Sequence, residues 1–319
     1  MRLFFTFCLL ITYSFTQAQR GNIWYFGKSA GLSFNTRPLT PLTDGQVNSR
    51  EGISTICDDN GRLLFYSNGE TIFNSIHQEM MNGTNLKGHL SSCQAVLILP
   101  KPGDKNLYYV FTSDALENDF LNGYNYHIVD MRLDGGLGAV VSKNNLLYAG
   151  SSERLTSVTA GDYKSYWVIT NEFNSNVFKA YKLDCSGLNT TPVVSVAGRK
   201  TDESPYSNIG VMRVSPNGKF LIQTNLKGRG LRTVPSDEYA QLFDFNNTTG
   251  VISNPRLFPL FDEGYYFGAE FSPNSQFLYM VNPEKENVYQ YDVSSANYAT
   301  IFGTKKIINV SRGELAAIA

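Results

Sequence analysis

Three histidines and one glutamate are the side chains of this sequence with the most scope for chemistry. His77 and His89 flank a polar loop, and Glu51 precedes the neighbouring predicted strand. If the loop folds over the end of that strand, Glu51, His77 and His89 would form a polar pocket for a ligand or a metal ion. The alternative is that they anchor the loop through hydrogen bonds, as most buried polar side chains do. We expect the anchor, and we expect His127 to be a packed or solvent-facing residue of a predicted strand.

Several motifs that position catalytic groups are missing from the sequence. It has no SxxK nucleophile, no cysteine with a placed histidine, and no GxGxxG or Walker A phosphate cradle. A glycine-basic run, KGRGLR at 227–232, has no helix predicted after it, so we expect it to be solvated. No CxxC pair of zinc ligands is present. The sequence therefore predicts no catalytic residue, no metal and no cofactor.

The cysteines outside the predicted leader are Cys57, Cys93 and Cys185, which is an odd number. A bridge between Cys57 and Cys93 is the obvious candidate. However, Cys57 ends its predicted strand whereas Cys93 begins one. An offset of about four residues at about 3.3 Å each places them more than roughly 10 Å apart along neighbouring strands, too far for a disulfide. We predict that all of these cysteines are unpaired.

A short pattern occurs twice and places two charges in equivalent positions. Val211–Ile222 (VMRVSPNGKFLI) and Gly268–Tyr279 (GAEFSPNSQFLY) each read as two strands around a Ser-Pro-Asn turn. Arg213 falls opposite Glu270 in otherwise apolar first strands. Because an unpaired charge beside a central channel is costly, we predict that the two form a structural ion pair between adjacent repeats.

Units of an inner and an outer hairpin recur along the chain, and four strands per unit is typical of a β-propeller blade. Two tandem β-sandwiches would be the alternative, but no Pro/Gly/Ser-rich linker divides the chain. In the first unit, the acidic turn at 58–61 (DDNG) has some features of a calcium loop. Its acidic residues are consecutive, however, and Asn-Gly is a strong hairpin signal, so we predict a plain turn. The units begin near Gly52, Ser92, Arg154, Ile209 and Phe267.

The two ends of the chain bear on how the ring closes. NIWYFG at 22–27 and AGLSFN at 30–35 read as outer strands that would complete a blade begun elsewhere in the chain. Gly313–Ala319 reads as the first strand of a sixth unit. We therefore expect residues 19–319 to form an all-β propeller of four-stranded antiparallel blades. It would have about five complete blades plus partial closing strands, in an incomplete ring whose reading frame continues.

Residues 1–18 have the features of a signal peptide: Arg2, an apolar core at 3–11, and Thr16-Gln17-Ala18 as a cleavage site. A membrane anchor is the alternative, but the core is well short of the roughly 20 residues that span a bilayer. We expect export to the cell surface or the extracellular space, with no membrane span after cleavage. The net charge of -1 predicts no nucleic-acid partner.

Several stretches resemble the N-terminal propeller of secreted bacterial proteins with a gliding-motility-associated C-terminal domain, the sorting domain of type IX secretion. They are NIWYFG at 22, LTDGQVNSREG at 42, GRLLFYSNG at 61, MNGTNLKGH at 81, LPKPGDKNLYYVFT at 99 and FSPNSQFLYM at 271. The sequence departs from that family in lacking the sorting domain. The resemblance implies a surface or extracellular role, downstream domains in a longer protein, and no defined chemistry.

These observations favour an exported, non-catalytic propeller that serves as a binding, adhesion or scaffold module for extracellular protein or glycan. The alternative is a propeller-type hydrolase, lyase or lactonase acting on extracellular carbohydrate, with carboxylates, histidine or a divalent metal at the channel mouth. A third possibility is a structural spacer that carries downstream domains.

Overall fold

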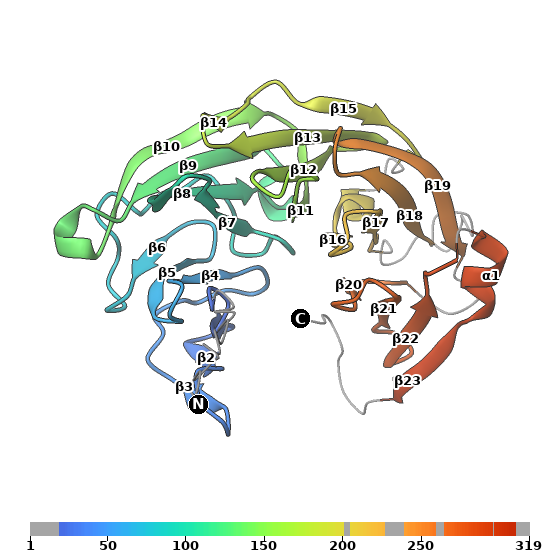
Figure 1. The fold of residues 1–319 in the computed structure, drawn as a ribbon, viewed down its shortest axis with the longest axis horizontal. Coiled ribbons are helices and arrows are strands. Elements are labelled where there is room, and N and C mark those ends of the chain that lie inside the picture. The colour runs from blue at the N-terminus through green and yellow to red at the C-terminus, as the bar shows by residue number, and fades with distance from the viewer. Residues whose placement is uncertain (1–18, 201–204, 227–238, 260–264, 296, 311–319) are drawn as a thin grey trace, which may run out of the picture.

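The computed structural model describes residues 19–200, 205–226, 239–259, 265–295 and 297–310. These residues form six small antiparallel sheets that follow one another around a centre, as the blades of a propeller do (Figure 1). The predicted all-β propeller is therefore confirmed, and the alternative of two tandem sandwiches is wrong. The observed number of sheets is close to the predicted number of blades.

Consecutive strands pair within each sheet, except that β15 pairs with β13. Strands β4, β7, β11, β16 and β20 lie nearest the centre in Figure 1. We number the sheets as blades 1 to 6. Blade 1 is β1 (Ile23–Phe26), β2 (Ala30–Ser33) and β3 (Thr40–Leu42); blade 2 is β4 (Ser54–Cys57), β5 (Leu63–Ser67) and β6 (Ile72–Asn74); blade 3 is β7 (Val96–Lys101), β8 (Asp104–Ser113), β9 (Tyr124–Asp130) and β10 (Ala139–Tyr148). Blade 4 is β11 (Ser151–Thr159), β12 (Tyr166–Glu172), β13 (Val177–Asp184), β14 (Gly187–Leu188) and β15 (Val193–Val196); blade 5 is β16 (Met212–Val214), β17 (Phe220–Gln223), β18 (Tyr239–Asn246) and β19 (Val251–Pro259); blade 6 is β20 (Ala269–Phe271), β21 (Phe277–Asn282), β22 (Asn287–Asp292) and β23 (Lys306–Val310).

Helical segments are short and lie in connections between strands. They are α1 (Tyr298–Gly303) and three 3₁₀ turns, η1 (Leu116–Asn118), η2 (Asp134–Gly136) and η3 (Pro205–Asn208). No helix within the described ranges is long and apolar enough to cross a membrane.

The repeated Ser-Pro-Asn segment forms the inner hairpin of blades 5 and 6, as predicted. Ser215 Oγ accepts a hydrogen bond from the Phe220 backbone N–H at 2.9 Å and donates to Asn217 Oδ1 at 2.8 Å. Ser272 Oγ repeats both bonds, accepting from Phe277 at 2.9 Å and donating to Asn274 Oδ1 at 2.7 Å. Because the side chain closes the turn locally, the same sequence gives the same hairpin in both blades.

The acidic turn of blade 2 is also closed by its own side chain. Asp58 Oδ1 accepts hydrogen bonds from the backbone N–H groups of Asn60 and Arg62, at 2.8 and 2.9 Å. Gly61 has a φ of 77°, which suits glycine in a tight turn. The predicted turn between β4 and β5 is confirmed.

Apolar side chains pack mainly between neighbouring blades. Trp167 and Phe178 of blade 4 share one core cluster with Leu221 and Phe243 of blade 5. The Trp167 indole also donates a hydrogen bond to the Asn247 carbonyl at 2.8 Å. Similar clusters join blades 5 and 6 and blades 2 and 3. The ring is therefore held together by blade-to-blade contacts, which stabilise it through apolar burial.

The predicted N-terminal strands at 22–27 and 30–35 are present as β1 and β2. Among the described residues, β1 and β2 pair with each other and with an unpredicted third strand, β3, as a sheet of their own. The predicted leader at 1–18, the first strand of a sixth unit at Gly313–Ala319 and the glycine-basic run at 227–232 lie outside the described residues.

Candidate functional site

Three side chains from three successive blades converge beside the inner strands. Glu51 lies just before β4, Cys93 lies just before β7, and Glu153 belongs to β11. One carboxylate or thiol atom of each lies within 4.8 Å of those of the other two. We call Glu51, Cys93 and Glu153 the inner cluster. Sequence reasoning grouped Glu51 with the histidines instead and missed the other two members.

Backbone contacts between blades position the inner cluster. The segment around Glu51 runs beside the segment before β7, because the Gly52 N–H donates to the Ser92 carbonyl at 3.0 Å. The backbones approach so closely that a Cβ on Gly52 would lie 2.4 Å from the Ala95 nitrogen, so this position requires glycine. Glu153 is fixed from blade 3, since its Oε2 accepts from the Cys93 N–H at 3.0 Å.

Burial raises the pKa values of the acidic groups in the inner cluster. The Glu153 side chain is almost fully enclosed, and its Oε1 accepts a second backbone bond, from Leu116, at 3.2 Å. Desolvation nevertheless raises the pKa of Glu153 to about 7, with a smaller contribution from the charge of Glu51. Desolvation likewise raises the pKa of the Cys93 thiol well above its ordinary value, and both carboxylates add to this shift. Among the three groups, Glu153 is therefore the one with a pKa in the neutral range.

The two predicted pocket histidines lie in different surroundings from Glu51. His77 contacts Tyr66 Oη through Nδ1 at 3.1 Å and Asp44 Oδ2 through Nε2 at 3.3 Å. His89 Nδ1 accepts from the Ser91 N–H at 3.2 Å. No hydrogen bond or ion pair among the described residues joins Glu51 to either histidine. Each histidine instead holds its own loop.

The third histidine is packed within blade 3. His127 is completely buried on β9, where its Nε2 contacts Thr112 Oγ1 at 3.1 Å and its Nδ1 accepts from the Asn144 N–H at 2.9 Å. Burial lowers its pKa to about 3, and Lys143 adds to the shift. His127 is therefore neutral at physiological pH and cannot serve as a proton acceptor near neutrality.

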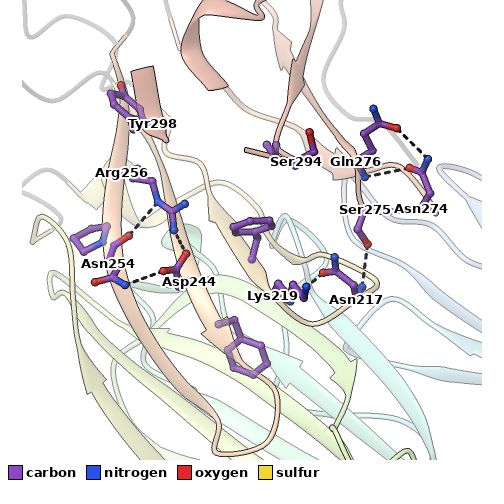
Figure 2. A pocket seen from close by; sticks show the side chains of 14 residues that line it. Asn217, Lys219, Asp244, Asn254, Arg256, Asn274, Ser275, Gln276, Ser294 and Tyr298 are labelled. Carbon is purple, nitrogen blue, oxygen red and sulfur yellow. Dashed lines mark hydrogen bonds and ion pairs between the residues drawn. The ribbon is translucent and has the colours of Figure 1, made fainter. Parts of the chain in front are cut away.

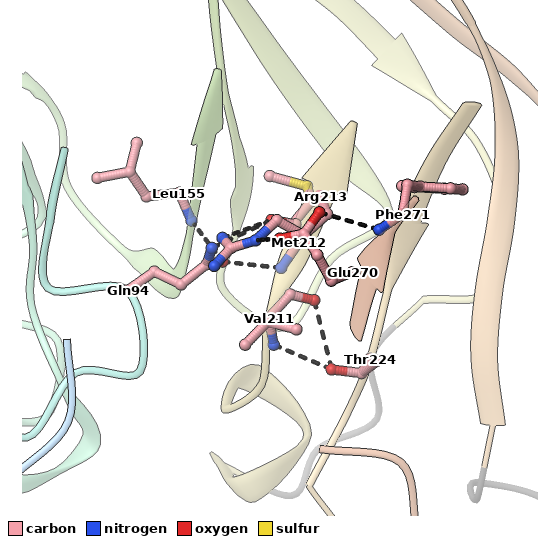
Figure 3. Close-up of polar contacts among 8 residues, drawn as sticks. All are labelled: Gln94, Leu155, Val211, Met212, Arg213, Thr224, Glu270 and Phe271. Carbon is pink, nitrogen blue, oxygen red and sulfur yellow. Dashed lines mark hydrogen bonds and ion pairs between the residues drawn. The ribbon is translucent and has the colours of Figure 1, made fainter. Parts of the chain in front are cut away.

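Gln94 joins three blades at the centre of the molecule (Figure 3). Its Oε1 accepts from the backbone N–H groups of Leu155 on β11 and Met212 on β16, at 3.1 and 2.7 Å. Its Nε2 donates to the Met212 carbonyl at 3.1 Å. One side chain from blade 3 thus supplies partners for backbone groups of blades 4 and 5, where an inner strand has no sheet neighbour on its central edge.

Arg154, the residue after Glu153, is also completely buried. Its guanidinium donates to the Thr224 carbonyl at 3.0 Å, to Asn225 Oδ1 at 2.7 Å and to the Ser207 carbonyl at 2.6 Å. These acceptors belong to blade 5 and to the η3 segment before it, so Arg154 links blades 4 and 5. Sequence reasoning marked this residue as the start of a unit and gave it no role.

The predicted partners Arg213 and Glu270 meet between blades 5 and 6. Arg213 Nε donates to Glu270 Oε2 at 2.9 Å, and about a third of each side chain is exposed to solvent (Figure 3). Glu270 Oε1 accepts from the Phe271 N–H at 2.9 Å. The pair is partly screened by water, so its contribution to stability is smaller than that of a fully buried pair.

The three cysteines among the described residues are free thiols. Cys57 is buried at the end of β4, Cys185 is exposed, and Cys93 lies in the inner cluster. The expectation that Cys57 does not bridge to Cys93 is confirmed.

A groove of about 1110 Å³ lies between blades 5 and 6 (Figure 2). One side is formed by the β16–β17 turn and by β18 and β19; the other is formed by the β20–β21 turn and by Val293, Ser294 and Tyr298. Of the three charged side chains that line it, Arg256 and Asp244 form an ion pair, and the third is Lys219. Asp244 also accepts from Asn254 Nδ2 at 2.8 Å. The uncharged lining includes amide and aromatic side chains: Asn217, Asn274, Gln276, Phe220 and Tyr298.

The chain shows no match to any protein-family profile, and no curated protein matches it. Solved structures with a similar arrangement include a 6-phosphogluconolactonase candidate from Bacteroides uniformis, with 14% identity, a TM-score of 0.48, and coverage of 88% of this chain and 78% of that one. Hydrazine synthase of Kuenenia stuttgartiensis is 14% identical, with a TM-score of 0.45 and coverage of 91% and 84%. A luciferin-regenerating enzyme is 11% identical, with a TM-score of 0.44 and coverage of 84% and 78%. At these levels the likeness carries no information about activity.

Proposed function

We propose that this chain is an exported, non-catalytic propeller that binds extracellular glycan in the groove between blades 5 and 6. The observation that carries the proposal is the chemistry of the lining. Planar amides pair with sugar hydroxyls as both donors and acceptors, and aromatic rings offer apolar faces to the C–H side of a sugar. Export rests on the signal peptide predicted at 1–18.

The hydrogen bonds of the groove leave donors available. Asn217 Oδ1 accepts from the Lys219 N–H at 3.0 Å, so the side-chain oxygen is committed to the turn. The amide nitrogen of Asn217 has no hydrogen-bond partner within the described part of the chain. On the opposite side, Asn274 Oδ1 holds the equivalent turn by accepting from Gln276 at 3.1 Å. The turns thus present amide groups from two blades to one groove.

The charge of the groove also favours a neutral ligand. Arg256 and Asp244 compensate each other, and the Arg256 guanidinium lies 5.5 Å from the centre of the Phe220 ring. A strongly charged ligand would have to compete with these pairings, whereas a sugar can use their remaining lone pairs and N–H groups.

A hydrolase acting on carbohydrate is the alternative, and the inner cluster is the feature that favours it. Two carboxylates, one of which titrates near neutrality, resemble the acid and nucleophile of a glycoside hydrolase. The Glu153 side chain, however, is only 1% exposed, and both of its oxygens accept backbone hydrogen bonds. A sugar could not reach it without displacing blade 3, so we favour binding over hydrolysis.

A panel of neutral oligosaccharides tested by isothermal titration calorimetry checks this proposal. We expect one class to bind and its affinity to fall at least about tenfold in an Asn254→Ala/Gln276→Ala double variant, because each lost polar contact is worth about 1 kcal/mol. Gln78→Ala, an exposed glutamine in blade 2, is the matched control and should bind normally. Equal binding by both variants would refute the groove, and release of reducing sugar would favour the hydrolase.

A further inference from the structure

We propose that Glu51, Cys93 and Glu153 form a site for a divalent cation of the zinc class, held jointly by blades 2, 3 and 4. The proposal concerns the inner cluster and is independent of the groove and of glycan binding.

The geometry places three donors around one point. Their ligand atoms lie within 4.8 Å of one another, whereas ligand atoms around one tetrahedral zinc ion lie roughly 3.5 Å apart, given zinc–oxygen and zinc–sulfur distances near 2.0 and 2.3 Å. Glu153 is held in place by two backbone N–H groups, and the exposed Glu51 has room to move. That limit exceeds the zinc geometry by about 1 Å, so the side chains would draw together by up to that amount on binding.

The negative charges at the inner cluster favour a bound cation. The thiol of Cys93 lies within hydrogen-bonding reach of both carboxylates, and the charge of Glu117 acts on Glu51 in the same unfavourable sense. Like charges held this close to the buried Glu153 carboxylate either retain protons or bind a cation.

The donor types select among cations. A thiolate is a poor ligand for calcium or magnesium, which prefer oxygen, whereas zinc accepts sulfur and carboxylate together. Three protein ligands would leave a fourth position for water. Binding would displace the protons that the buried carboxyl and thiol otherwise retain, so affinity should rise with pH.

Cobalt titration of the full chain tests the site, because a cysteine thiolate bound to Co²⁺ gives a charge-transfer absorption band. After treatment with a chelator, we expect one equivalent of CoCl₂ to produce the band and ZnCl₂ to displace it. Zinc in excess should also raise the melting temperature, since a ligand that binds only the folded chain stabilises it. If no band appears at one equivalent, or if zinc does not change the melting temperature, the proposal is overturned. Protons shared among the three groups would then explain how they lie so close together.

Matched variants locate the ion. Cys93→Ser should abolish the band, whereas Cys185→Ser, which removes an exposed thiol elsewhere, should leave it unchanged. Glu51→Gln is the variant of choice for a carboxylate, because the exposed position tolerates it and any loss of folding would show in circular dichroism. We expect its zinc affinity to fall at least about tenfold. An unchanged affinity in Glu51→Gln, or a band that persists in Cys93→Ser, would place the metal elsewhere.

Discussion

Arg213 and Glu270 occupy the same position in consecutive blades, 57 residues apart, and the Arg213 Nε lies 2.9 Å from the Glu270 Oε2. The pairing follows from the repeat. Residues in the same position of adjacent blades face each other across one interface, so opposite charges there link β16 to β20. The side chains are 33% and 32% exposed, which places the pair between a surface ion pair and a buried one.

A double-mutant cycle on this pair should therefore give a modest coupling. We expect Arg213→Ala and Glu270→Ala each to lower the free energy of unfolding, and the coupling between them to be about 0.5–1 kcal/mol. Urea denaturation of the two single variants and the double variant measures it. Strictly additive losses would show that the contact contributes nothing, and high salt should reduce the coupling because the pair is partly exposed.

Replacing Gln94 should destabilise the fold much more than its small size suggests. Gln94→Ala leaves the N–H groups of Leu155 and Met212 without the side-chain oxygen that they share, in a buried place. We expect a loss of about 2–4 kcal/mol in the free energy of unfolding, since each buried polar group left unpaired costs about 1–3 kcal/mol. Gln46→Ala, at an exposed position, serves as the control and should cost far less. Similar losses in the two variants would mean that the central bridge has no special role.

Acid should destabilise the protein through His127. Its pKa is about 3 in the folded state, below the 6.5 of an unfolded chain, because the buried ring resists charging. The unfolded chain therefore binds a proton in the window between these values while the folded chain does not. This contribution to stability is complete above pH 6.5 and falls by about 1.4 kcal/mol per pH unit as the pH drops below it.

The pH profile of His127→Gln isolates this contribution. The variant should be less stable than the parent at pH 7, yet its free energy of unfolding should fall less steeply between pH 6.5 and 4. Chemical denaturation at several pH values gives both profiles. Parallel slopes would show that His127 takes up its proton equally in the two states.

Gly250 should tolerate alanine poorly for two separable reasons. It has a φ of 78°, and an added Cβ would lie 2.8 Å from the ring of Trp167, which is packed between blades 4 and 5. Gly135 has a similar φ of 63° but open space around it. We expect Gly135→Ala to cost about 1 kcal/mol through backbone strain alone and Gly250→Ala clearly more through the added clash. Thermal unfolding compares them, and equal shifts would remove the packing argument.

Local sequence signals were sufficient for the blades. Ser215 and Ser272 each close a hairpin with their own hydroxyl, and Asp58 closes the turn between β4 and β5, so the strands on both sides of each turn could be predicted. The equivalence of Arg213 and Glu270 followed from aligning the same repeat. These features depend on contacts between residues close in sequence or at equal positions of a repeat, which a linear pattern records.

Only the tertiary structure decided which polar groups meet. Glu51, Cys93 and Glu153 all lie within one residue of a predicted unit start, a signal that an alignment of those starts would have revealed, yet their convergence depends on how three blades are inclined toward the centre. The same holds for Gln94, whose side chain satisfies backbone groups of β11 and β16. The sequence by itself determined a repeated hairpin and hence a propeller, because turns are local. The ring alone determined the candidate sites, because burial and the distances between blades arise only when the blades pack.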